Sequence, residues 1–345
     1  MPHLLNSIDE SLAPWLRDHS QGAYRLGQVR NWLFTRRAAD FEAMTDLPQK
    51  LRAELANDFA LWTTSIARHT RADDGTEKLL LTLADGGQIE CVLLRDEVRR
   101  TICISTQVGC GMGCVFCASG LDGLARNLTI GEIVEQMLRL QQLLGPDERL
   151  SHIVVMGMGE PLANLDNLLP ALEEASREDG LGISARRITI STVGLPKAMR
   201  RLADAGARYR LAVSLHAPND EIRRQIVPPG EKIALADILA EADHYFELSG
   251  RQLTFEYVLL ADINDRPEHA HELARLLGHR TALVNVIPFN PVAGLPYRTP
   301  STSAQQAFRR ILEDHGLAVR FRHRKGDAID AACGQLRRRT VQQIS

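Results

Sequence analysis

Three cysteines in a glycine-rich loop give this chain its strongest chemical signal. Cys110, Cys114 and Cys117 follow an apolar, β-branched stretch at residues 101–106 that is typical of a strand. Three thiolates on one short loop can bind three irons of a 4Fe-4S cluster and leave the fourth iron open to a substrate. A structural zinc ion would need a fourth ligand, and three buried, inert thiols are the remaining alternative.

The loop opens a region in which short apolar runs alternate with longer helical patterns. Such alternation is typical of a parallel sheet with right-handed crossovers, so the sequence predicts an α/β fold. We expect an open, partial (β/α)6 barrel whose site lies at the carboxyl ends of the strands, with a further edge strand at residues 317–321. The six expected strands span residues 102–106, 153–156, 187–191, 211–215, 253–259 and 283–287.

The residues before the barrel divide into two further parts. Periodic apolar positions predict a small helical domain at the N-terminus. Turn sequences then bracket alternating apolar stretches at residues 78–82 and 88–94, which predicts a β-hairpin extension. The expected parts are a helical N-terminal domain at 1–75, a β-hairpin linker at 76–98, the α/β core at 99–325 and a C-terminal segment at 326–345.

The composition is that of an ordinary globular protein, with 345 residues, 44% of them hydrophobic, and a net charge of -2. That charge gives no global support for a nucleic-acid partner, although basic residues gather near the C-terminus. Six cysteines indicate a reducing compartment, and we find no secretory signal and no membrane-spanning run, so we expect a cytoplasmic protein. The basic cluster comprises Arg320, Arg322, His323, Arg324, Lys325, Arg337, Arg338 and Arg339.

Small polar and charged residues follow several of the expected strands. Gly159 allows close approach of the backbone, and the neighbouring Glu160 can bind an ammonium group of a ligand. His216 is expected to position a cofactor rather than to transfer protons, and Asn290 can both donate and accept hydrogen bonds. The residues expected to bind a cofactor are Gly159, Glu160, Ser191, Ser214, Leu215, His216 and Asn290.

The cysteine loop, with Phe116 before its last cysteine, resembles that of the radical S-adenosylmethionine (SAM) superfamily. In that setting, the turn at 157–161 resembles the motif that recognises the amino group of SAM. Further motifs extend the likeness over nearly the whole chain, which looks like a member of the RlmN/Cfr family. That family methylates an adenosine of large-subunit ribosomal RNA. The motifs lie at residues 101–110, 126–128, 157–161, 214–219, 268–272 and 326–336.

The resemblance implies a mechanism with two cysteines outside the loop. Cys333 would take a methyl group from one SAM, and a second SAM, reduced by the 4Fe-4S cluster, would supply the radical that activates this methyl group for addition to adenine. Cys103 would then attack the Cys333 sulfur and close a disulfide that frees the methylated base. Glu90 matches the family's proton acceptor. The cluster ligands would be Cys110, Cys114 and Cys117.

The resemblance also implies partners and leaves alternatives open. The partners would be 23S rRNA, transfer RNA for some relatives, and an electron donor such as flavodoxin or ferredoxin, with the N-terminal domain binding RNA. RlmN-type enzymes act at C2 of adenine and Cfr-type enzymes at C8, and overall likeness favours C2. A noncatalytic RNA-binding module with a structural metal is a different class of protein. A radical-generating activase would need the loop but neither Cys103 nor Cys333.

Overall fold

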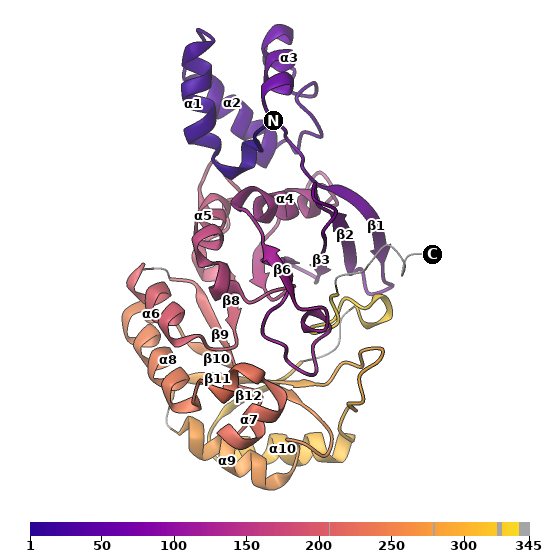
Figure 1. The fold of residues 1–345 in the computed structure, drawn as a ribbon, viewed down its shortest axis with the longest axis vertical. Coiled ribbons are helices and arrows are strands. Elements are labelled where there is room, and N and C mark those ends of the chain that lie inside the picture. The colour runs from indigo at the N-terminus through magenta and orange to yellow at the C-terminus, as the bar shows by residue number, and fades with distance from the viewer. Residues whose placement is uncertain (207, 279, 323–325, 338–345) are drawn as a thin grey trace.

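The computed structural model describes residues 1–206, 208–278, 280–322 and 326–337. Its centre is one sheet with the strand order β1-β2-β3-β4-β7-β8-β9-β10-β11-β12, which does not close on itself. Figure 1 shows the N-terminal helices at one end of the molecule and helices α9 and α10 at the other. Of the basic cluster near the C-terminus, His323, Arg324, Lys325, Arg338 and Arg339 lie outside the described residues.

The strands of the expected partial barrel are all present and pair in parallel. The expected edge strand is also confirmed, because β12 pairs in parallel with β11. Apolar side chains that alternate along these strands, such as Ile102, Ile153 and Leu211, are fully buried. The parallel strands are β4 (Arg100–Cys103), β7 (His152–Val155), β8 (Ile188–Thr192), β9 (Arg210–Ser214), β10 (Leu253–Leu259), β11 (Ala282–Pro288) and β12 (Ala318–Phe321).

Helices connect the parallel strands, and Figure 1 shows α5, α6 and α8 along one side of the sheet. Helix α4 begins with a capping box, in which Thr129 accepts from the Glu132 N–H over 3.2 Å and Glu132 accepts from the Thr129 N–H over 2.9 Å. None of the helices in the described ranges combines the length and apolarity that crossing a membrane requires. The helices are α4 (Ile130–Gln141), α5 (Leu165–Ser176), α6 (Pro196–Asp204), α7 (Asp220–Ile226), α8 (Leu235–Ser249), α9 (Pro267–Leu277) and α10 (Thr302–Asp314).

Three helices and an antiparallel extension precede the barrel. The helices are α1 (Ile8–Asp18), α2 (Tyr24–Phe34) and α3 (Gln49–Asp58). The expected hairpin is confirmed as β2 (Glu77–Thr82) and β3 (Gln88–Arg95). The expectation of helix up to residue 75 was wrong for β1 (Ser65–Arg71), which pairs antiparallel with β2. This strand is largely exposed along its length, so it lacks the apolar alternation by which strands are recognised in a sequence.

A buried arginine ties the N-terminal helices to the barrel. Arg30 on α2 donates to Asp9 over 2.9 Å and to Glu174 on α5 over 3.1 Å, and it forms an ion pair with Asp179 at 2.7 Å. Its side chain is only 1% exposed, so these carboxylates offset the cost of burying its charge.

Between β4 and α4 the chain forms a second, small sheet that carries the cysteine loop. Its two strands, β5 (Gln107–Gly109) and β6 (Leu124–Asn127), pair antiparallel and bring the two ends of the loop together. Short 3-10 turns complete the fold at Leu4–Asn6, Ala118–Gly120, Pro161–Asn164, Ala185–Arg187, Pro228–Glu231 and Asp327–Ile329.

Candidate active site

The cysteine loop leaves the barrel through a backbone conformation that only glycine adopts easily. Gly109 has a φ of +79°, and a Cβ there would lie 2.0 Å from the Gly123 carbonyl oxygen. This close approach lets the Cys110 N–H donate to that carbonyl over 3.0 Å. Farther along, the Cys117 N–H donates to the Cys114 carbonyl over 3.1 Å, which forms a tight turn between these two cysteines.

All three loop cysteines line one cavity of about 150 Å³, which we call the loop cavity. Burial raises the pKa of each thiol, to about 11 for Cys110. In the described ranges, no three His, Cys, Asp or Glu side chains converge on a point where they could hold one metal ion. A cubane cluster does not need such convergence, because each thiolate binds a different iron.

Glu160 lines the loop cavity together with the cysteines and lies at the turn after β7. Its two carboxylate oxygens accept from the Leu162 N–H over 3.0 Å and from the Val193 N–H over 2.9 Å. The turn needs Gly159, whose φ is +105° and where a Cβ would lie 2.6 Å from the Gln107 side chain. Burial raises the pKa of Glu160, and a cationic group of a ligand would favour its charged form.

Residues at the ends of β8 and β9 complete the rim of the loop cavity. The Ser191 and Ser214 hydroxyls lie 3.5 Å apart, and both line the cavity. His216 follows β9 with a φ of +58°, and its Nδ1 accepts from the Val258 N–H over 3.0 Å. Burial, with Arg223 as a second cause, lowers the pKa of His216 to about 3, so the ring is neutral and its Nε2 carries the proton. This neutral ring can position a ligand.

Two expected cofactor residues have different positions. Asn290 lines the loop cavity, and its amide donates to the Cys333 carbonyl over 3.0 Å while its Oδ1 has no protein partner among the described residues. Leu215 was expected at the same rim, but its side chain packs in the hydrophobic core and does not line the cavity. Its backbone N–H donates to the Glu256 carbonyl over 3.0 Å, because the chain between Ser214 and His216 still follows the sheet.

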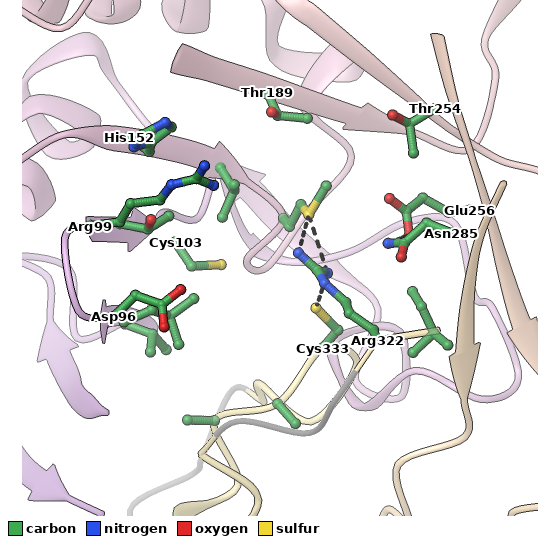
Figure 2. Close-up of a pocket in the computed structure, with 18 of the residues that line it drawn as sticks. Asp96, Arg99, Cys103, His152, Thr189, Thr254, Glu256, Asn285, Arg322 and Cys333 are labelled. Atoms are coloured by element: carbon green, nitrogen blue, oxygen red, sulfur yellow. Dashed lines mark hydrogen bonds between the residues drawn. The ribbon is translucent and has the colours of Figure 1, made fainter. Parts of the chain in front are cut away.

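A second and larger cavity of about 470 Å³, the barrel cavity, lies inside the sheet. Cys103, at the end of β4, and Cys333, in the C-terminal segment, both line it, and Figure 2 shows their sulfur atoms facing into it. Cys333 also lines the loop cavity, whereas Cys103 does not. Cys333 therefore stands on the partition between the two cavities. Burial, and the nearby Cys333 as a second cause, raises the pKa of Cys103 to about 12.

A partly buried arginine beside Cys333 was not expected as a site residue. The guanidinium of Arg322 donates to the Cys333 sulfur over 3.1 Å and lies 3.8 Å from the Met156 sulfur (Figure 2). The electrostatic interaction with Cys333 is the main cause that raises the pKa of Arg322. In the sequence this arginine belongs to a basic run, so its position after β12 did not distinguish it from the basic residues around it.

Two polar residues on neighbouring strands were also missed. Glu256 and Asn285 are register partners on β10 and β11, and the Asn285 amide donates to the Glu256 carboxylate over 2.7 Å. Both side chains line the barrel cavity. Burial raises the pKa of Glu256. A carboxylate and an amide inside two otherwise apolar strands were the signal that could have identified them.

Glu90 does not line either cavity. It lies on β3 under the C-terminal segment, in a separate cavity of about 190 Å³. Its carboxylate forms a buried ion pair with Lys78 at 3.0 Å and accepts from the Arg337 N–H over 3.0 Å. The Lys78 ammonium group also donates to the Asp330 carbonyl over 2.9 Å. The structure therefore brings Cys103 and Cys333 together but keeps Glu90 apart from them.

The open parallel barrel, with three cysteines on the loop after β4 and an acidic turn after β7, defines the chain as a radical SAM protein. The family model described as the Radical SAM superfamily matches residues 104–276. A second family model, described as the ribosomal RNA large subunit methyltransferase N-terminal domain, matches residues 3–61. Members of this superfamily use SAM and a 4Fe-4S cluster.

Relatives that match nearly the whole chain identify the family within this superfamily. The chain is 63% identical to a probable dual-specificity RNA methyltransferase RlmN of Rhodopirellula baltica, over 97% of this chain and 91% of the relative. It is 47% identical to the protein of the same description in Symbiobacterium thermophilum, over 96% of this chain and 90% of the relative. The chain belongs to the RlmN family of radical SAM RNA methyltransferases.

A solved structure supports the same assignment. The crystal structure of a radical SAM methyltransferase from Sphaerobacter thermophilus is 40% identical and superimposes with a TM-score of 0.94, over 98% of this chain and 99% of that chain. The residues of the loop cavity fit the cofactors of this class. Three thiols line a cavity that is also lined by a carboxylate and by the Asn290 Oδ1, which no described residue engages. This set suits a cluster and a ligand with amino and hydroxyl groups.

Proposed function

We propose that this protein methylates C2 of an adenosine in 23S rRNA and of an adenosine in transfer RNA. The observation that carries the proposal is the position of Cys333 on the partition between the loop cavity and the barrel cavity, with Cys103 on the barrel side only. The names of the relatives support it, because they describe dual-specificity RNA methyltransferases. Since these RNAs are the proposed substrates, the proposal places the protein in the cytoplasm.

In this proposal the loop cavity binds the cofactors. Cys110, Cys114 and Cys117 would hold the 4Fe-4S cluster, and Glu160 would face the amino group of SAM. Ser191, Ser214, His216 and Asn290 would contact the remaining polar groups of SAM. When bound, the cluster and two SAM molecules per turnover supply a methyl group and the radical that activates it, with electrons from a donor such as flavodoxin or ferredoxin.

Cys333 would carry the carbon from the loop cavity to the adenine ring in the barrel cavity. Cys103 would then attack the Cys333 sulfur, so that a disulfide forms while the bond between that sulfur and the carbon breaks. The carbon keeps the electron pair of the broken bond and takes up a proton to become the new methyl group. An external thiol would reopen the disulfide for the next turnover. Since burial raises the pKa of Cys103 to about 12, its proton must be removed before or during this attack.

Glu90 would take the proton from the adenine ring carbon, and the one electron left unpaired by the radical addition would return to the 4Fe-4S cluster. Its carboxylate is engaged by Lys78 and by the Arg337 N–H, so this role requires the segment at residues 330–337 to move. Movement there would break the Arg337 contact and the bond from Lys78 to the Asp330 carbonyl together. A Glu90→Gln variant would then still load a methyl group onto Cys333 but would not release a methylated base.

Mass spectrometry of nucleosides tests the proposal directly. Unmodified 23S rRNA and transfer RNA transcripts would be incubated with anaerobically reconstituted protein, SAM and a reductant. Formation of 2-methyladenosine in both RNAs supports the proposal, whereas 8-methyladenosine moves the protein to the C8 branch. Cleavage of SAM without methylated RNA would indicate a radical activase for another substrate. A protein that holds zinc and does not cleave SAM would be a noncatalytic module.

A further inference from the structure

The barrel cavity has an opening whose residues take no part in the chemistry described above. From Cys103 and Cys333 the cavity extends to the amino ends of the parallel strands, where its lining includes Thr101, His152 and Thr254 at or near the start of β4, β7 and β10. At about 470 Å³ it falls within the range of roughly 300–1,000 Å³ found for ligand pockets.

Arginines surround this opening. Arg99, Arg187 and Arg210 line the cavity and are exposed to solvent. Figure 2 shows the Arg99 side chain extending into the cavity beside His152. Burial is the main cause that lowers the pKa of His152, and the charges of these three arginines are the further causes. All three arginines therefore lie close to His152.

The three guanidinium groups are available to a ligand. Within the described ranges, none of them forms an ion pair with a carboxylate, and the one hydrogen bond of such a group is from Arg210 to the Arg186 carbonyl over 3.0 Å. The neighbouring Arg95 and Arg100 differ, because both are paired with Glu148. An unpaired cluster of positive charge at the mouth of a cavity attracts an anion and raises its local concentration.

The opposite end of the barrel is covered by the protein itself. The cysteine loop and the C-terminal segment contact each other there, with the Ala118 N–H donating to the Gly334 carbonyl over 2.8 Å and the Ser119 hydroxyl to the Leu336 carbonyl over 2.6 Å. As far as the described residues show, a large substrate that must reach Cys333 therefore has its approach at the amino ends of the strands.

We propose that RNA approaches the barrel at this end, and that Arg99, Arg187 and Arg210 bind the phosphates flanking an adenosine whose base enters the barrel cavity. The inference rests on the proposed function, since it takes RNA as the substrate. A base that reacts inside a pocket must leave its stack, while the charged backbone stays at the mouth, where arginine is well suited to bind phosphate. The cavity would thus bind the adenine base, and the three arginines would bind the flanking phosphates.

Charge reversal tests this entrance. The variant R99E/R187E/R210E of the reconstituted holoenzyme would be compared with wild type for binding of an unmodified 23S rRNA transcript, by fluorescence anisotropy over a range of salt concentrations. We expect binding to weaken at least tenfold and the slope of log Kd against log salt to fall by about 2 to 3, since each lost phosphate contact removes roughly 0.7–0.9. The variant R266E/R275E/R310E changes the net charge equally at exposed arginines on or beside α9 and α10 and serves as the control.

The outcomes distinguish the proposed RNA entrance from the proposed methylation reaction. Wild-type affinity and salt slope in the triple variant would overturn the proposal, and so would an equal loss in the control, which would indicate unspecific attraction. If the Glu variant does not fold, R99Q/R187Q/R210Q carries the test with the same expected direction. Binding is measured without turnover, so a wild-type protein that methylates neither RNA would refute the proposed function while a selective binding loss would still support this entrance.

Discussion

The Arg322 guanidinium donates a hydrogen bond to the Cys333 sulfur over 3.1 Å, inside the barrel cavity. A charge-assisted contact of this kind stabilises a thiolate more than a thiol, and it holds the sulfur at the partition between the two cavities. Arg322 also contacts the Met156 sulfur, and Glu256 lines the same cavity.

Replacement of Arg322 should therefore slow the reaction of Cys333 with a neutral alkylating agent. For R322Q we expect a rate at least about tenfold lower at neutral pH, since a hydrogen bond to a charged group contributes roughly 1.5–3 kcal/mol. Peptide mapping of protein treated anaerobically with iodoacetamide measures the rate at Cys333 alone. R320Q is the matched control, because Arg320 lines the same cavity without a contact to Cys333. Equal rates in R322Q and wild type would contradict the role of the arginine.

The two buried cysteines on neighbouring strands should differ in their effect on turnover. We expect C103A to accumulate an RNA adduct on Cys333, because no thiol remains in the barrel cavity to displace it. In C91A, product formation should continue, since Cys91 is buried in the hydrophobic core and lines neither cavity. Mass spectrometry of nuclease-digested protein after anaerobic turnover detects the adduct. Its absence in C103A, or its appearance in C91A, would remove Cys103 from the mechanism.

His216 should make folding sensitive to acid. Burial lowers its pKa to about 3, so below the ordinary value of 6.5 the unfolded chain binds a proton that the folded chain does not. This contribution to stability is present above pH 6.5 and is lost as the pH falls toward 3, at about 1.4 kcal/mol per pH unit for one group. In H216N, the amide oxygen can replace Nδ1 as acceptor for the Val258 N–H, and asparagine tolerates the left-handed backbone.

Urea denaturation of the anaerobic protein at several values between pH 7 and pH 5 compares the two. We expect the free energy of unfolding of wild type to fall more steeply with decreasing pH than that of H216N. The difference between the two slopes should correspond to at most one bound proton. The comparison with H216N is needed because Glu160 and Glu256 have raised pKa values and act in the opposite direction. Parallel pH dependence in the two proteins would show that His216 is charged in the folded state.

The Arg30 ion pairs should matter for the attachment of the N-terminal helices. For R30M we expect a loss of about 2–4 kcal/mol in the free energy of unfolding, below the full value for a buried pair because Asp9 and Asp179 are partly exposed. R36M is the control: Arg36 is exposed, its ion pair with Asp46 spans 3.8 Å, and its removal should cost less than about 1 kcal/mol. Faster proteolysis between α3 and β1 in R30M would locate the loss. Equal stability of both variants would contradict this assignment.

Several parts of the fold followed from local sequence because the signal was local. The parallel strands carry buried apolar runs, and β10 (Leu253–Leu259) was expected with the bounds that it has. β1 was missed because an exposed edge strand has no apolar alternation. Leu215 was assigned to the rim from its neighbours in the chain, but successive side chains of a strand point to opposite faces, and its own turns into the core.

In the candidate site, too, local spacing predicted residues close in sequence but not the contacts between distant residues. The cluster ligands are close in sequence, so their spacing alone determined that Cys110, Cys114 and Cys117 share one loop and could bind an iron-sulfur cluster. Glu90 was expected to act with Cys103 and Cys333, yet the fold holds it in another cavity.

Contacts between residues far apart in the chain were decided by the tertiary structure alone. The order of the strands in the sheet and the path of the C-terminal segment place Cys103 and Cys333 in one cavity, set Arg322 against Cys333, and gather Arg99, Arg187 and Arg210 at its mouth. No local pattern specifies such contacts, because they depend on how the whole sheet curves and packs.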